Sequence, residues 1–264
     1  MAFVEVNGVR LAYDDRGDGP HTFVFIHGWA CDRSFWQPQF DNLSRNFRCV
    51  SVDLRGCGES APVPPYDTMT AAEDVTALIE ELKLPPVLIV GHSLGGIVGL
   101  LVNDMRPELV HGLVLGDSPL TAARSGGFAG TVRRITEAGS MEPMRKFIEG
   151  FFTEGTPPAV RERVQDVMLG CDPGVGAGML GNASALAERL DAMVAAADKK
   201  PLMAIWAEKP QGDPEHMRDI TMFIRQEPIA GGGHFFQLEQ PDITNALLRA
   251  FVDDVERDPR LQTP

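Results

Sequence analysis

Short apolar runs separated by turn residues mark the first part of the chain. Four of them are rich in β-branched and aromatic residues, as strands are: 3–6, 9–14, 22–27 and 49–53. The run 22–27 is apolar at successive positions, which is typical of a parallel strand covered by helices on both faces. The pattern therefore predicts a central sheet.

Helical and strand-like segments alternate along the next part of the chain. Residues 70–84 show helical periodicity and begin with Thr70 and Glu73 at the spacing of a capping box. A buried strand over 87–90, a helix over 94–105 and a strand over 113–116 follow. This alternation predicts an α/β fold with a doubly wound, mostly parallel sheet.

The pattern changes over residues 119–200, which contain amphipathic helical stretches and glycine-rich breaks. We expect a helical cap here, inserted between two parts of one core, residues 1–118 and 201–264. Strand-like runs return at 201–206 and 222–229, and an amphipathic helix is expected over 242–256.

Composition narrows the class of protein. Hydrophobic residues make up 44% of the chain and charged residues 23%, as in ordinary soluble domains. A net charge of −13 disfavours nucleic acid and anionic membranes as partners. No basic and apolar leader pattern and no apolar run of bilayer length are apparent, so we expect a cytoplasmic protein, with a homo-oligomer left open.

The four cysteines have neither zinc-ligand spacing nor the density of a disulfide scaffold. We therefore expect reduced thiols, no metal and no cofactor. Cys49 fits a buried strand, whereas Cys31 follows a candidate site loop and could line a pocket.

Ser93 is the candidate nucleophile. It stands in the Gly-x-Ser-x-Gly pattern of residues 91–95, with a predicted strand before it and a predicted helix after it. Such a strand-to-helix turn exposes the serine oxygen, and flanking glycines let strand and helix approach closely. The flanking elements make this pattern specific, since the five residues alone are common.

His234 is the candidate base, because it follows the last predicted strand, where the order serine, acid, histidine places it. The loop with His27, Gly28 and Trp29 follows an earlier buried strand and is expected to donate a backbone N–H to an oxyanion. The predicted oxyanion donors are the N–H groups of Trp29 and Leu94. His27 itself is expected to fix the loop.

The acid has two candidates. The usual Gly-x-x-Asp after the strand 201–206 is missing, since Ala207 and Pro210 stand at its two ends. Asp213 lies three residues beyond, and Asp117 directly follows the strand 113–116. We favour Asp117 slightly, with Asp213 as the alternative, although an aspartate at position 117 could also be a helix cap.

A substrate pocket is expected around the nucleophile, and it suits a small, largely apolar molecule. Its predicted lining residues are Trp29, Cys31, Phe147, Phe151 and Phe235. For each aromatic residue alone, plain packing of cap on core is the competing interpretation. The polar segment 53–60 is interpreted as a structural loop.

These motifs, in this order and spacing, resemble those of the α/β-hydrolase superfamily: His27-Gly28, Asp53-x-Arg55-Gly56-x-Gly58-x-Ser60, the 91–96 turn and Gly233-His234. The resemblance spans residues 3–118 and 201–256. It implies a serine hydrolase that cleaves an ester, lactone or related carbonyl through a Ser-His-Asp triad and an acyl-enzyme, as small bacterial esterases and lactonases do.

Two alternatives remain open at this point. Cofactor-independent dioxygenases that cleave 3-hydroxy-4-quinolones share this fold, a Gly-Trp loop after the third strand and a His-Asp dyad with the aspartate after the later strand. They typically carry extra histidines near that loop and the serine turn, which this sequence replaces with Ala30-Cys31-Asp32-Arg33 and Ser-Leu-Gly. The third hypothesis is a ligand-sensing receptor, which the complete set of triad candidates disfavours.

Overall fold

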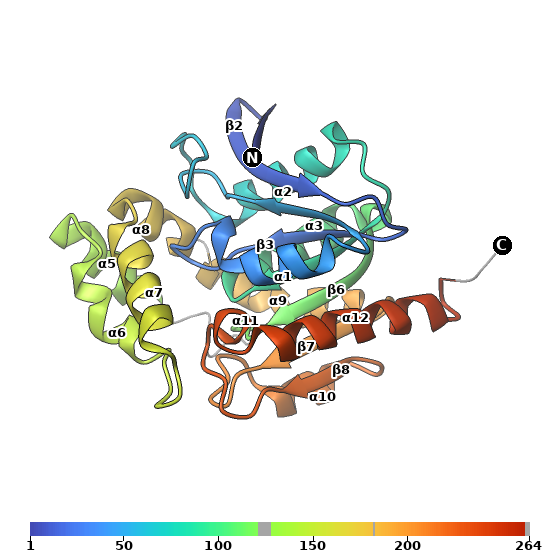
Figure 1. Cartoon of the computed structure of the whole chain (residues 1–264). Helices are drawn as coiled ribbons and strands as arrows, with labels where there is room; N and C mark the ends of the chain where they lie inside the picture. The colour runs from blue at the N-terminus through green and yellow to red at the C-terminus, as the bar shows by residue number, and fades with distance from the viewer. Residues whose placement is uncertain (121–127, 182, 262–264) are drawn as a thin grey trace.

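The computed structural model describes residues 1–120, 128–181 and 183–261, and these build one eight-stranded sheet between layers of helices (Figure 1). The strand order is β1-β2-β4-β3-β5-β6-β7-β8. β1 and β2 pair antiparallel, as do β2 and β4, and all other neighbours pair parallel. The strands are β1 (Ala2–Val6), β2 (Val9–Arg16), β3 (Thr22–Ile26), β4 (Arg48–Val52), β5 (Val87–His92), β6 (Val110–Gly116), β7 (Leu202–Trp206) and β8 (Arg225–Pro228). The predicted fold class is confirmed.

The central strands are buried on both faces because helices cover each side. β3, β5 and β7 are buried at every position, which explains their continuous apolar sequence. One face packs on α1 (Gln37–Leu43) and α12 (Pro241–Arg257), where Phe25, Trp36 and Phe251 share one core cluster. The other face packs on α2 (Thr68–Glu81) and α3 (Leu94–Met105). Two apolar layers therefore hold the sheet rigid beneath its carboxyl edge.

The start and end of α2 differ from the sequence prediction. The side chain of Asp67 accepts hydrogen bonds from the N–H groups of Met69 and Thr70, so Asp67 is the N-cap and the helix begins at Thr68. The predicted cap at Thr70 was wrong. Lys83 has a φ of 50°, a left-handed conformation that ends helices, and α2 stops at Glu81 rather than continuing to residue 84.

In Figure 1, helices from the expected cap region lie together at one side of the sheet, on the left of the view. They are α5 (Ala129–Ala138), α6 (Arg145–Glu149), α7 (Pro158–Gly170) and α8 (Pro173–Gly181), whereas α9 (Ala183–Ala197) lies among the core elements. α5 packs on α8, whereas α9 packs on both α8 and core helix α3. The last helix of the region, α9, thus connects α8 to the core helix α3. Residues 121–127 and 182, which fall in the predicted cap, lie outside the described residues.

The remaining elements are short. They are α10 (Pro214–Ile220), α11 (Phe236–Glu239) and the 3₁₀ turns at Arg33–Trp36, Pro107–Leu109 and Glu142–Met144. The strand expected over 222–229 is shorter, because Asp198 accepts the N–H groups of Met222 and Phe223 and holds them out of the ladder. Among the described helices, none has both the length and the hydropathy that a membrane crossing requires.

Candidate active site

Ser93 occupies a strained turn between β5 and α3. Its φ of 52° and ψ of −118° are unusual for a residue with a side chain, and such strain is a feature of functional turns. The turn is held by hydrogen bonds from Ser93 N–H to the carbonyl of Gly116 (2.7 Å) and from Gly96 N–H to the carbonyl of Ser93 (3.0 Å). A Cβ at Gly95 would lie 2.4 Å from the carbonyl oxygen of Ile26, so only glycine lets α3 start this close to β3.

The loop after β3 lies against this turn. The buried ring of His27 accepts the N–H of Leu54 at Nε2 (3.0 Å), so its Nδ1 carries the proton and donates to the carbonyl of Gly28 (2.8 Å). Burial lowers the pKa of His27, which favours this neutral form. A Cβ at Gly28 would lie 3.3 Å from the Cβ of Ser93, so the loop backbone runs next to the serine. Both ring nitrogens of His27 therefore fix the loop.

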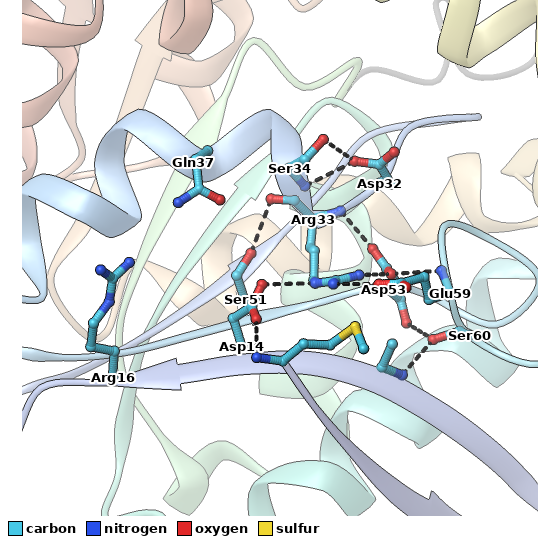
Figure 2. A network of polar contacts seen from close by, with 12 residues as sticks. Asp14, Arg16, Asp32, Arg33, Ser34, Gln37, Ser51, Asp53, Glu59 and Ser60 are labelled. Carbon is cyan, nitrogen blue, oxygen red and sulfur yellow. Dashed lines mark hydrogen bonds and ion pairs between the residues drawn. The ribbon is translucent and has the colours of Figure 1, made fainter.

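A partly buried ion network anchors the residues that follow this loop, and Figure 2 shows Arg33 at its centre. The guanidinium of Arg33 pairs with Asp53, with Asp14 at 2.8 Å and with Glu59 at 2.6 Å, while the Arg33 N–H donates to Asp53 (2.7 Å). Asp53 is fully buried, and its carbonyl accepts the hydroxyl of Ser60 (2.7 Å). These contacts support the structural interpretation of the segment 53–60. The sequence alone did not single out Arg33 as the partner.

The structure brings Asp117 to His234. Oδ2 of Asp117 lies 2.6 Å from Nδ1 of His234, and both side chains are buried. The other carboxylate oxygen accepts the N–H of Gln211 at 3.0 Å and of Ala207 at 3.4 Å. Asp213 instead accepts the N–H groups of Glu215 and His216 and so caps α10.

The backbone of His234 is held by two further hydrogen bonds that sequence reasoning missed. Its N–H donates to the carbonyl of Phe151, a residue that follows α6 in the cap region (2.9 Å). Its carbonyl accepts a hydrogen bond from Nε2 of His92, the residue before the serine (2.8 Å). The partners lie 83 and 142 positions away in sequence, so no local pattern could have revealed them.

Aromatic rings surround the imidazole of His234. The ring of Phe151 is stacked on it, with centroids 4.4 Å apart and planes inclined by 29°. The His92 ring lies 4.5 Å away, and Phe235 meets the imidazole edge to face at 5.1 Å. The imidazole is therefore fixed in orientation from several sides before any ligand binds.

His92 is a buried neutral histidine. Burial, reinforced by neighbouring His234, holds its pKa well below the usual range. Its Nε2–H donates to the carbonyl of His234, and its Nδ1 has no hydrogen-bond partner among the described residues. Nδ1 faces the loop after β3, since a Cβ at Gly28 would lie 2.9 Å from it. His92 thus links the serine turn, His234 and the loop after β3.

Ser93 and His234 line one cavity of about 200 Å³. Leu94 and all five predicted pocket residues, Trp29 among them, border it, and further lining residues lie outside that predicted set: Pro119, Phe128, Met168, Leu180 and Gln211. Burial raises the pKa of the Cys31 thiol well above its usual range, so this lining group is neutral. The indole N–H of Trp29 donates to the carbonyl of Gly176 in α8 (2.8 Å), which ties the loop to the cap region.

The described residues contain no group of three or more histidine, cysteine, aspartate or glutamate side chains arranged to hold a metal ion.

Comparison with known proteins gives the family. A family model described as the alpha/beta hydrolase family matches residues 23–247. The chain belongs to this family. An α/β-hydrolase superfamily protein, YisY of Bacillus subtilis (strain 168), is 25% identical over 259 residues, covering 92% of this chain and 95% of that protein.

Solved α/β-hydrolase structures have the same fold. A thermophilic esterase from Thermogutta terrifontis superposes with a TM-score of 0.84 at 23% identity, covering 96% of this chain and 98% of that one. Est816, described as an N-acyl homoserine lactone degrading enzyme, superposes with a TM-score of 0.83 at 22% identity, covering 95% and 100%. At these identities the likeness shows the fold and leaves the reaction to be argued from the site.

Proposed function

We propose that this α/β-hydrolase is a serine hydrolase that cleaves an ester, lactone or related carbonyl through Ser93, His234 and Asp117. The observation that carries the proposal is the 2.6 Å contact between Asp117 and His234, with His234 and Ser93 bordering one cavity. A buried carboxylate on Nδ1 fixes the tautomer in which Nε2 is free to take a proton. Nucleophile, base and orienting acid are then present together.

The proposed reaction has two steps. Ser93 Oγ attacks the carbonyl carbon while His234 takes its proton, and His234 then passes that proton to the leaving oxygen. Water, deprotonated by the same imidazole, next attacks the acyl-enzyme and releases the acid with Ser93 restored. The N–H groups of Trp29 and Leu94 are assigned to the oxyanion, where each donor contributes roughly 3 kcal/mol in comparable enzymes.

The cavity favours a small, uncharged and largely apolar substrate. Aromatic and aliphatic side chains from core and cap make most of its described wall, and no Lys, Arg, Asp or Glu side chain belongs to that described wall. Transfer of a charged group into such surroundings is costly. We assign the helices of residues 119–200 the role of a cap over this cavity, and we place the enzyme in the cytoplasm.

The test is a panel of neutral esters and lactones assayed by product release, with oxygen uptake on 3-hydroxy-4-quinolones measured in parallel. We expect hydrolysis of at least one neutral ester or lactone, and its loss in both Ser93→Ala and His234→Ala. Oxygen uptake that survives Ser93→Ala but not His234→Ala would replace hydrolysis with the oxygenase alternative. A circular dichroism spectrum of each variant shows whether the fold is intact.

A further inference from the structure

The cap region contacts the base itself as well as the substrate cavity. Phe151 follows α6, and its carbonyl accepts the backbone N–H of His234 at 2.9 Å. Its ring stacks on the imidazole with centroids 4.4 Å apart and planes 29° from parallel. One residue therefore holds both the backbone and the ring of His234.

The stacking geometry places a π face against a group that becomes a cation during the reaction. An aromatic face attracts a cation that lies within about 6 Å of its centroid, and the attraction grows when water is excluded. His234 is 4% exposed and Phe151 8%, so water reaches this contact poorly. The contact is consequently stronger with the imidazolium than with the neutral imidazole.

We propose that Phe151 is a positioning residue that stabilises the protonated form of His234 through its ring and fixes the histidine backbone through its carbonyl. This inference rests on the proposed role of His234 as general base. The cap region then has two roles: it encloses the substrate, and through Phe151 it assists the proton transfer to His234. The effect falls on kcat, since the imidazolium forms after the substrate has bound.

Other titratable groups face His234 from the elements packed around it. Asp117 approaches from the end of β6, and the neutral His92 from β5. Glu239 of α11 accepts the N–H of Gly233, next to the base, at 2.8 Å. The hydroxyl of Ser93 and the neutral thiol of Cys31 belong to residues that line the same cavity as His234. None of these groups is altered when the Phe151 side chain is replaced, so the contribution of the ring can be isolated.

Replacement of the Phe151 ring should move the pH dependence of the reaction in a defined direction. Phe151→Leu keeps the carbonyl that accepts the His234 N–H but removes the π face, so protonation of the imidazole becomes harder. The acidic limb of the kcat/KM profile should then move to lower pH by about 0.4 to 1.5 on the pH scale. At the plateau, kcat should fall about three- to thirtyfold. Phe151→Tyr retains an aromatic face, so it should restore most of the plateau kcat and most of the original position of the acidic limb.

Phe152→Leu is the matched control. Phe152 is the next residue. Its ring centroid lies 6.4 Å from that of Phe235, and the guanidinium of Arg161 lies over its face. It belongs to neither the proposed triad nor the described cavity wall, so its replacement should leave the acidic limb in place. A shift of the same size in Phe152→Leu would attribute the effect to looser packing of the cap and overturn the proposal.

The deciding measurement is an NMR titration of the His234 ring in protein labelled with ¹⁵N-histidine, which needs no substrate. The titration midpoint should fall in Phe151→Leu, stay in place in Phe152→Leu and return in Phe151→Tyr. If Phe151→Leu does not fold, 3,5-difluorophenylalanine at position 151 keeps the shape and weakens the π face, and the midpoint should fall there too. An unchanged or raised midpoint would overturn the proposal. A lowered midpoint in a protein without esterase activity would support it while removing the proposed function.

Discussion

His92 donates a 2.8 Å hydrogen bond from its Nε2 to the main-chain carbonyl of His234, so the residue before the serine holds the residue that is proposed to activate it. The serine turn and the loop that carries His234 lie far apart in the sequence, yet the buried imidazole of His92 joins them. Their separation is therefore set by a direct bond as well as by the packing of the sheet.

This bond predicts a loss of rate with little loss of stability in His92→Phe. The substitution removes the unpaired Nδ1 of His92 but leaves the His234 carbonyl unpaired, so one unsatisfied buried atom replaces another. We expect the free energy of unfolding in urea to change by less than about 1 kcal/mol, while kcat falls roughly tenfold as the base loses its alignment. His92→Gln can still offer a donor and should recover part of kcat. Equal rates for the Phe and Gln variants would contradict this role.

Replacement of the two candidate acids, Asp117 and Asp213, should have very different effects on kcat. Asp117→Asn removes the carboxylate that orients His234, and kcat should fall by roughly 10³- to 10⁴-fold with the fold intact. Asp213→Asn keeps a side chain that can cap α10, so kcat should stay within about twofold and stability within about 1 kcal/mol. Steady-state kinetics and urea unfolding of both variants measure this. A steep loss confined to Asp213→Asn would reverse the assignment.

The network around Arg33 predicts a large effect on stability. Arg33→Met leaves the fully buried carboxylate of Asp53 without its ion-pair partner, and this should cost about 3–5 kcal/mol in the free energy of unfolding. The matched control is Arg48→Met, which breaks the partly exposed pair with Asp15 and should cost at most about 1 kcal/mol. Similar urea midpoints for the two variants would show that the network does not anchor the loop.

Stability should fall as the solution is acidified from pH 7 towards pH 5. Burial lowers the pKa of both His27 and His92, so the unfolded chain binds protons near pH 6.5 that the folded protein does not accept. Below that pH each buried histidine should cost up to about 1.4 kcal/mol per pH unit. Urea unfolding at several pH values in this range gives the slope of the unfolding free energy against pH, and this slope should be smaller in His92→Phe by about one proton. Equal slopes of free energy against pH in variant and wild type would show that His92 is not held neutral.

The sequence was sufficient to predict those elements of the fold whose hydrophobic pattern follows directly from their burial. The helix predicted over 94–105 has those bounds in the structure, because its apolar face and the glycine turn before it are local features. The start of α2 was misplaced because Asp67 and Thr70 are both good capping residues, and only the backbone geometry shows which side chain receives the N–H groups.

The site was only partly predictable for a similar reason. Ser93 and His234 stand in recognisable local motifs, whereas the choice between Asp117 and Asp213 depends on strand order. β6 lies beside β5, and the carbonyl of Gly116 accepts the N–H of Ser93, so Asp117 follows directly beside the serine. The roles of His92 and Phe151 come from contacts between distant segments, which no periodicity encodes.

The most direct test of the central claim is labelling with a small fluorophosphonate, followed by intact mass measurement and peptide mapping. An activated serine should give one adduct per chain, located on Ser93 and absent from Ser93→Ala, with labelling slowed strongly in His234→Ala and Asp117→Asn. An unlabelled wild-type protein, or an adduct at another residue that persists in Ser93→Ala, would contradict the account.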